Sequence, residues 1–171
     1  MSTEKGMVIR RRRVEGELVV EQTRDLGGVA AMLTAAGMTT EGITWPAGCY
    51  LMAYLGREPV GVVGIETKVD AALMRSLVVI EPMRRRGVGK ALVEAARAAA
   101  HTRGARRLYC FADGAANDYL KRFGFKLASI GEAQTALAGT FMVDNLRTWP
   151  DKISQCHTLC LDISHDGVVI R

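Results

Sequence analysis

The sequence predicts a single α+β domain with a mixed central sheet of about seven strands flanked by helices. The chain has 171 residues, of which 49% are apolar and 24% charged, so it can bury one sizeable core but is short for two full domains. After a first strand and a helix, its β-rich runs form a meander of three strands and then alternate with helical segments, an order typical of an α+β sheet. We expect the domain to span residues 14–171, with residues 1–13 as either an added strand or a basic arm.

The first half of the chain predicts a strand, a helix and the meander. Residues 17–24 (ELVVEQTR) are rich in strand formers, and residues 25–37 follow as a helix with Asp25 as N-cap and Gly37 as stop. Three consecutive strands are then expected at residues 49–55, 60–66 and 72–80. The first two of these are separated by GREP, whose Gly and Pro favour a tight turn and hence a hairpin.

The second half predicts alternating helices and strands. From Gly87 the apolar residues recur every three or four positions, the period of a helix, and Gly104 is a natural end for it. The remaining expected elements are a strand at 106–112, a helix at 115–123, a strand at 125–130, an amphipathic helix at 132–149 stopped by Pro150, and a last strand at 157–163.

The positive charge of the chain is concentrated in one segment. Between Arg84 and Arg107 there are eight cations and one acid, Glu94, a local excess of +7 in a chain whose net charge is +5. Such a field serves a polyanion: nucleic acid, a membrane surface or a phosphorylated cofactor. No apolar segment approaches the ~20 residues that cross a bilayer, and the N-terminal cations have no apolar stretch behind them. We therefore expect a cytoplasmic protein without a membrane partner.

The four cysteines predict free thiols rather than a disulfide framework. They are scattered over predicted strands and loops in a domain able to bury its own core. The segment CHTLC, from Cys156 to Cys160, offers one histidine and no second ligand pair, which does not suit zinc. We expect no metal.

The segment RRRGVGK, from Arg84 to Lys90, predicts an anion-binding loop. It lies between a strand and a helix, where backbone amides and the positive end of the helix dipole point at one spot. Gly87 and Gly89 let a phosphate approach the main chain. A Walker loop is excluded because Arg84 and Ala91 stand at its glycine and Ser/Thr positions, and a Rossmann fingerprint because Leu92 replaces its third glycine.

This loop resembles motif A of the GNAT superfamily of acetyl-coenzyme A-dependent N-acetyltransferases, and YLKRFGF about thirty residues later strengthens the resemblance, which runs from about Leu18 to Ile163. It implies acetyl-CoA as co-substrate and a sheet that splays between its fourth and fifth strands. It also implies that pantetheine pairs with the backbone of the fourth strand and the pyrophosphate with the loop. The cofactor-binding residues would be Leu77, Val78, Val79, Arg84, Arg85, Arg86, Gly87, Val88, Gly89 and Lys90.

At two positions this sequence departs from the family's pattern of functional residues. The tyrosine that protonates the thiolate in many of these enzymes falls on Leu120, so its neighbour Tyr119 is the candidate acid, and the family's pantetheine-binding asparagine falls on Asp113. For the general base, Glu66 near the end of the third strand is the first choice and Asp70 the second, with a water chain to solvent as the alternative.

The acceptor is expected to be a small amine. A narrower likeness to arsenic-resistance-type N-acetyltransferases and, more distantly, to N-acetylglutamate synthase domains rests on DAALMRSLVVIEP and TTEGI, and implies an amino-acid-like acceptor. Arg75 is a cation inside a β-rich run, which is costly unless paired. It either bridges to an acid of the protein or binds a substrate carboxylate.

Three other functions stay open at this stage. A protein N-acetyltransferase and a CoA-binding sensor without catalysis would keep the same fold. A nucleic-acid-binding module is suggested by Arg10 to Arg13 and a pI near 9.2, but the basic residues lack interleaved aromatics for base stacking, so no nucleic-acid partner is expected. The sequence does not set the oligomeric state, and a homodimer is one form it allows.

Overall fold

The protein folds around one mixed sheet. The computed structural model describes residues 16–46, 48–146 and 154–167. The strand order is β1-β2-β3-β4-β5-β7-β6, with β4 and β5 parallel and the other neighbours antiparallel. The strands are β1 (Leu18–Thr23), β2 (Gly48–Leu55), β3 (Glu58–Lys68), β4 (Ala71–Val79), β5 (Arg107–Ala112), β6 (Lys126–Leu127) and β7 (His157–Asp162). The predicted α+β class is confirmed.

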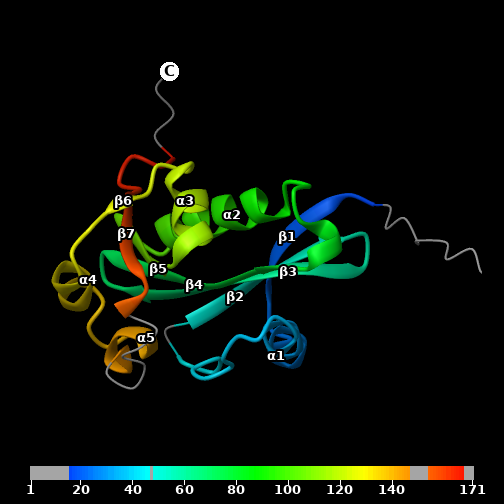
Figure 1. The fold of residues 1–171 in the computed structure, drawn as a ribbon, viewed down its shortest axis with the longest axis horizontal. Helices are drawn as coiled ribbons and strands as arrows, with labels where there is room; N and C mark the ends of the chain where they lie inside the picture. Colours follow the sequence, from blue (N-terminus) through cyan, green and yellow to red (C-terminus); the bar gives the residue numbers. More distant parts are fainter. Residues whose placement is uncertain (1–15, 47, 147–153, 168–171) are drawn as a thin grey trace, which may run out of the picture.

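Helices cover both faces of this sheet. In Figure 1, α2 and α3 lie on one side of the sheet, and α1 and α5 on the other. The helices are α1 (Leu26–Ala35), α2 (Val88–Thr102), α3 (Gly114–Lys121), α4 (Ile130–Ala136) and α5 (Phe141–Asp144), with a 3-10 turn η1 (Glu81–Met83) before α2. None of the helices in the described ranges is long and apolar enough to cross a membrane.

The predicted ends of α1 and the predicted C-terminal end of α2 are confirmed. The Asp25 carboxylate accepts a hydrogen bond of 2.9 Å from the amide of Gly28, which caps α1. Gly37, with φ of 70°, and Gly104, with φ of 91°, follow the ends of α1 and α2 in the left-handed conformation that glycine adopts easily.

Two predictions for the second half were wrong. The strand expected at 125–130 is reduced to Lys126–Leu127, because Ser129 caps α4 by accepting a hydrogen bond from the amide of Glu132. The single helix expected from residue 132 is two short helices, α4 and α5. Gly139 separates them with φ of 91°, a conformation that no helix continues through. Pro150 lies outside the described residues.

A β-bulge in β4 changes which side chains face which layer. Arg75 pairs with Gly64 and Val78 with Val62, so Ser76 and Leu77 stand opposite one residue of β3. Ser76 has φ of 56°, which is uncommon for a residue with a side chain. Such an extra residue shifts the strand's alternation by one. In a regular strand Leu77 would face the same side of the sheet as Arg75. Because of the bulge, it packs toward the α2 side instead.

The sheet opens between β4 and β5. These parallel strands pair from Ala71 to Leu73 with Arg107 to Tyr109, although β4 continues to Val79. On the face away from α2, one apolar cluster forms around α1 and a second around α4 and α5. The sheet therefore has a split at β4. On the face away from α2, a gap beside this split separates the two apolar clusters.

Candidate functional site

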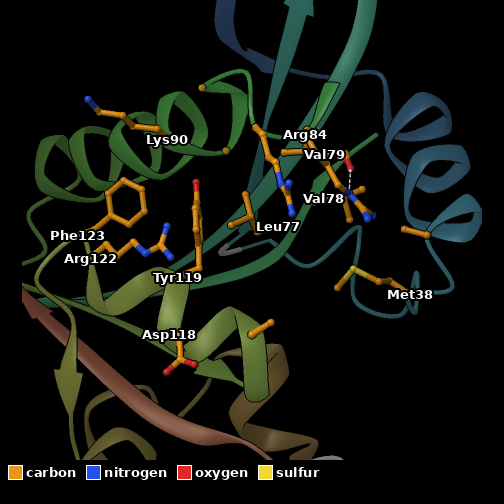
Figure 2. A pocket seen from close by; sticks show the side chains of 15 residues that line it. Met38, Leu77, Val78, Val79, Arg84, Lys90, Asp118, Tyr119, Arg122 and Phe123 are labelled. Carbon is orange, nitrogen blue, oxygen red and sulfur yellow. Dashed lines mark hydrogen bonds between the residues drawn. The ribbon is translucent and has the colours of Figure 1, made fainter. Parts of the chain in front are cut away.

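A large cavity lies at the split, with most of its lining on the α2 side of the sheet. It has a volume of about 1090 Å³ and is walled by the end of β4, the loop before α2, and α3 (Figure 2). The lining residues are Ala36, Met38, Leu77, Val78, Val79, Arg84, Arg85, Gly87, Gly89, Lys90, Ala115, Asp118, Tyr119, Arg122 and Phe123. Most of the residues that the sequence assigned to a cofactor therefore surround one space. The exceptions are Arg86 and Val88, which are absent from its described lining.

The loop presents backbone amides to this cavity. Gly87 is the N-cap of α2 with φ of 83° and ψ of 0°, and an added Cβ there would meet no atom of the described residues within 4 Å. Glycine is therefore required at position 87 by backbone conformation. The first turn of α2 contains no acidic residue, and the first amides of a helix have no partner within it. This arrangement can hold a phosphate.

Gly89 differs from Gly87, because its lack of a side chain matters for space and not for backbone conformation. A Cβ at Gly89 would lie 2.6 Å from the Tyr119 hydroxyl oxygen and 3.7 Å from a Val79 methyl group. Figure 2 shows Tyr119 reaching from α3 toward the beginning of α2. The bare Cα of Gly89 thus keeps this part of the cavity open.

The cations of the loop do not all point in one direction. Arg84 donates from Nε to the Val79 carbonyl at 3.2 Å and so ties the loop to the end of β4. Lys90 lies 3.8 Å from Glu94 in an exposed ion pair. Arg85 and Arg86 are exposed, so their attraction for an anion acts through solvent and weakens with salt.

One face of α3 forms the opposite wall. Ala115, Asp118, Tyr119, Arg122 and Phe123 line the cavity, and their spacing of three and four residues is that of a helix face. Sequence analysis singled out only Tyr119 from this set, although the same spacing in AANDYLKRF could have found the others. Their shared face makes α3 the second support of the site.

The structure places Tyr119, rather than Leu120, on the cavity. Leu120 is 4% exposed and belongs to the core under α2, whereas Tyr119 is half-buried and stacks edge-on against Phe123. Burial raises the pKa of the Tyr119 hydroxyl above its usual value, against a smaller opposing effect of Arg122. The hydroxyl is therefore protonated at neutral pH and can donate a proton. Its catalytic role remains a prediction.

Two polar residues of α3 lie near the position of the family's asparagine. Asp113 is the exposed N-cap residue. Asn117 is 8% exposed, and its Oδ1 has no hydrogen-bond partner among the residues that the structure describes. Buried amide oxygens are normally paired, so Asn117 is the better placed of the two to receive a donor.

A smaller cavity lies in the gap on the other face of β4. Its volume is about 230 Å³. Its lining residues are Gly37, Met38, Thr39, Leu73, Met74, Arg75, Ser76, Phe111, Met142 and Cys156. Met38 borders both cavities, and Ser76 and Leu77 of the bulge border one each. The two cavities are therefore adjacent, beside the part of β4 that no longer pairs with β5.

Arg75 enters the smaller cavity already paired. Its Nη2 donates to the Glu41 carbonyl at 2.8 Å, its Nε to Ser76 Oγ at 3.3 Å, and its Nη1 lies 3.5 Å from Glu66 Oε2. The guanidinium also stands over the Phe141 ring, 5.4 Å from its centroid. The expected bridge to an acid of the protein is present, and whether a substrate carboxylate also binds Arg75 stays a prediction.

The candidate bases lie elsewhere. Glu66 is 2% exposed and does not occur among the described residues that line either cavity. Asp70 stands in the turn before β4, at the opposite end of that strand from the split, and pairs with Arg107 at 4.0 Å. The structure brings Tyr119 and Arg75 to cavity walls but leaves both candidate carboxylates away from them.

Comparison with known proteins agrees with this geometry. A family model described as Acetyltransferase (GNAT) family matches residues 30–125, more than half of the chain. No curated protein sequence matches.

Solved structures with the same fold are distant in sequence. N-acetylglutamate synthase from Neisseria gonorrhoeae, complexed with coenzyme A and N-acetyl-glutamate, has a TM-score of 0.65 and 17% identity over 87% of this chain and 36% of that one. Rv2747 from Mycobacterium tuberculosis, in complex with CoA, has a TM-score of 0.65 and 15% identity over 84% and 98%. A GNAT acetyltransferase from Staphylococcus aureus has a TM-score of 0.65 and 9% identity over 86% and 99%. The present chain spans about a third of the synthase.

Proposed function

The chain belongs to the acetyltransferase (GNAT) family, and from this premise we propose that it transfers an acetyl group from acetyl-CoA to the primary amine of a small molecule. The observation that carries the proposal is the pair of adjacent cavities beside β4. One has an amide-rich loop suited to a pyrophosphate, and the other is separate and small. Two substrates could thus approach the same point from opposite faces of the sheet, which is what direct transfer between them requires.

The proposed chemistry uses few residues of the chain. The amide of Val79 polarises the thioester carbonyl, and a neutral amine attacks its carbon. As the C–N bond forms and the C–S bond breaks, Tyr119 gives its hydroxyl proton to the departing thiolate. The described lining of the smaller cavity contains no carboxylate and no imidazole, so we propose that the proton of the amine leaves through water, which then restores Tyr119.

The smaller cavity favours an amino-acid-like acceptor. A volume of about 230 Å³ is below the roughly 300–1,000 Å³ of common ligand pockets. Arg75 is the one charged side chain among its described lining residues, and Met38, Met74 and Met142 make much of the rest apolar. We propose that Arg75 binds an acceptor carboxylate. The N-acetyl-glutamate in the complex of the similar synthase is a ligand of this class.

A panel of amines tests the proposal. The common amino acids, their decarboxylated amines, and peptides with free N-termini or lysines are incubated with acetyl-CoA, and the released thiol is measured. We expect release with carboxylate-bearing amines, and acetyl-CoA binding near 1 μM, about −8 kcal/mol. Release with peptides alone would make the protein a protein N-acetyltransferase, binding without any release would make it a CoA sensor, and calorimetry without binding would overturn the proposal.

A further inference from the structure

The carboxylate of Glu66 is fully engaged within the protein. Its Oε1 accepts a hydrogen bond of 2.6 Å from the amide of Phe141. Its Oε2 accepts one of 3.3 Å from the amide of Met142 and lies 3.5 Å from Arg75 Nη1. The side chain is 3% exposed. Such contacts between distant segments hold a buried carboxylate in one orientation.

The two amides that Glu66 binds begin the one-turn helix α5. The N-cap residue of α5, Thr140, makes no side-chain cap, because its hydroxyl donates to the Leu137 carbonyl at 2.7 Å. Helices of this length are not stable alone, and their first amides need partners. Glu66 supplies these partners from β3, so the position of α5 depends on this carboxylate.

Helix α5 is also a wall of the smaller cavity. Met142 lines the cavity, and the Phe141 ring covers the Arg75 guanidinium. The same ring packs 5.6 Å from the centroid of Trp45 and against Gly42, where an added Cβ would collide with it. Displacement of α5 would therefore move the wall and uncover Arg75 together.

We propose that Glu66 is a positioning residue that fixes α5, and with it the width and charge of the acceptor cavity. This rests on the proposed function of that cavity, and it replaces the assignment of Glu66 as general base. A base must reach the proton that it removes, whereas the oxygens of Glu66 face two amides and a guanidinium. The carboxylate also neutralises Arg75 in part, so it tunes how strongly that cation attracts a substrate carboxylate.

Amide exchange tests this inference without any substrate. Glu66→Gln keeps the shape of the side chain and removes its charge, and Glu58→Gln makes the same change at an exposed position of the same strand. We expect the amides of Phe141 and Met142 to exchange about tenfold faster in Glu66→Gln, the loss of one charge-assisted bond, and to be unchanged in Glu58→Gln. Unchanged exchange in Glu66→Gln would overturn the inference. If that variant does not fold, Glu66→Asp, which shortens the reach, is measured instead.

Kinetics with the best amine of the panel distinguish positioning from catalysis. We expect Glu66→Gln to raise the KM of the acceptor about tenfold, because loss of the fixed cavity wall outweighs the stronger attraction of Arg75 for a carboxylate. The KM of acetyl-CoA and the pKa values of the kcat profile should stay as in wild type. A lower kcat with loss of the acidic limb, at an unchanged acceptor KM, would identify Glu66 as the base and overturn the inference. A panel without any acceptor would end the proposed function, while the exchange result would still decide the role of Glu66 in holding α5.

Discussion

The two cavities beside β4 are built in different ways. The larger one takes its anion-binding part from a continuous segment, Leu77 to Lys90, and its opposite wall from one face of α3. The smaller one is assembled from the segment after α1, β4, β5, α5 and Cys156. The charges of the first are mostly exposed, whereas the ion pair beside the second is buried, with Arg75 and Glu66 side chains 4% and 3% exposed.

This difference in construction follows from the kind of group that each cavity would bind. A phosphate site can be made from backbone amides, a helix end and two glycines, so a few consecutive residues specify it. A pocket for a small acceptor needs side chains from several directions, and these come from segments distant in sequence. The first site should therefore respond to local backbone changes and to salt, and the second to the loss of buried partners.

The largest effect is expected from Arg75→Met, which removes the charged side chain of the smaller cavity. It leaves the Glu66 carboxylate buried without its cation, which we expect to lower the free energy of unfolding by about 3 kcal/mol. Chemical denaturation measures the change, and Arg57→Met, at an exposed arginine, is the control. The folded fraction should still bind acetyl-CoA with wild-type affinity in calorimetry. A loss of acetyl-CoA affinity in folded Arg75→Met would show that the two cavities do not act independently.

Next in size is the effect of Tyr119→Phe, which acts on the cofactor side. Removal of a general acid should lower kcat about 100-fold, with little change in the KM of acetyl-CoA. Because burial raises the pKa of Tyr119, the wild-type hydroxyl keeps its proton above the ordinary tyrosine pKa of about 10. The kcat of wild type should therefore not fall until the pH exceeds that value. If kcat falls below that pH in wild type and falls in the same way in Tyr119→Phe, the titrating group is not Tyr119.

A moderate effect is expected from Gly89→Val, for which the chain offers a matched control. Gly89 and Gly131 each occupy the second position of a helix, α2 and α4, but a Cβ at Gly131 would have no neighbour within 4 Å in the part of the chain that the structure describes. Gly89→Val should lower acetyl-CoA affinity by tenfold or more, about 1.4 kcal/mol, and so lose most of the thermal shift given by acetyl-CoA. Gly131→Val should keep that shift, and equal shifts in both variants would contradict the placement of the loop.

The double variant Gly89→Ala with Tyr119→Phe separates two causes of that loss. If position 89 acts only through the Tyr119 hydroxyl, which an added Cβ would approach to 2.6 Å, removal of the hydroxyl should restore affinity. If the bare Cα packs against the pyrophosphate, the loss should persist in the double variant. Calorimetry of the two single variants and the double variant measures the coupling.

The smallest effect concerns salt. Because Arg85 and Arg86 are exposed, raising the ionic strength from 0.05 to 0.5 M should weaken acetyl-CoA binding by about threefold through screening. The KM of the acceptor should change less, since the charge pair beside its cavity is buried. Titrations at several salt concentrations test this, and equal salt dependence of both substrates would remove the electrostatic distinction between the cavities.

Local signals predicted most of the elements and part of the site. Strand-forming runs, the hydrophobic period, Asp25 and the glycines that end helices located the first four strands, α1 and α2, because these signals act within a few residues. The region between Gly124 and the last strand was misjudged, since β6 is only Lys126–Leu127 and Gly139 divides the expected helix, whereas the strand expected at 157–163 is present as β7. Short elements there are stabilised by distant partners, such as Glu66 for α5, which a local pattern does not contain.

By itself, the sequence determined the glycine loop and its placement between a strand and a helix, since backbone conformation and helix polarity are set by neighbouring residues. Only the tertiary structure decided three further points. It turned Tyr119 rather than Leu120 toward the cavity, placed an extra residue at Ser76 that redirects Leu77, and enclosed Glu66 under α5. Each depends on packing between segments far apart in the chain, and such packing overrides local preference where the two compete.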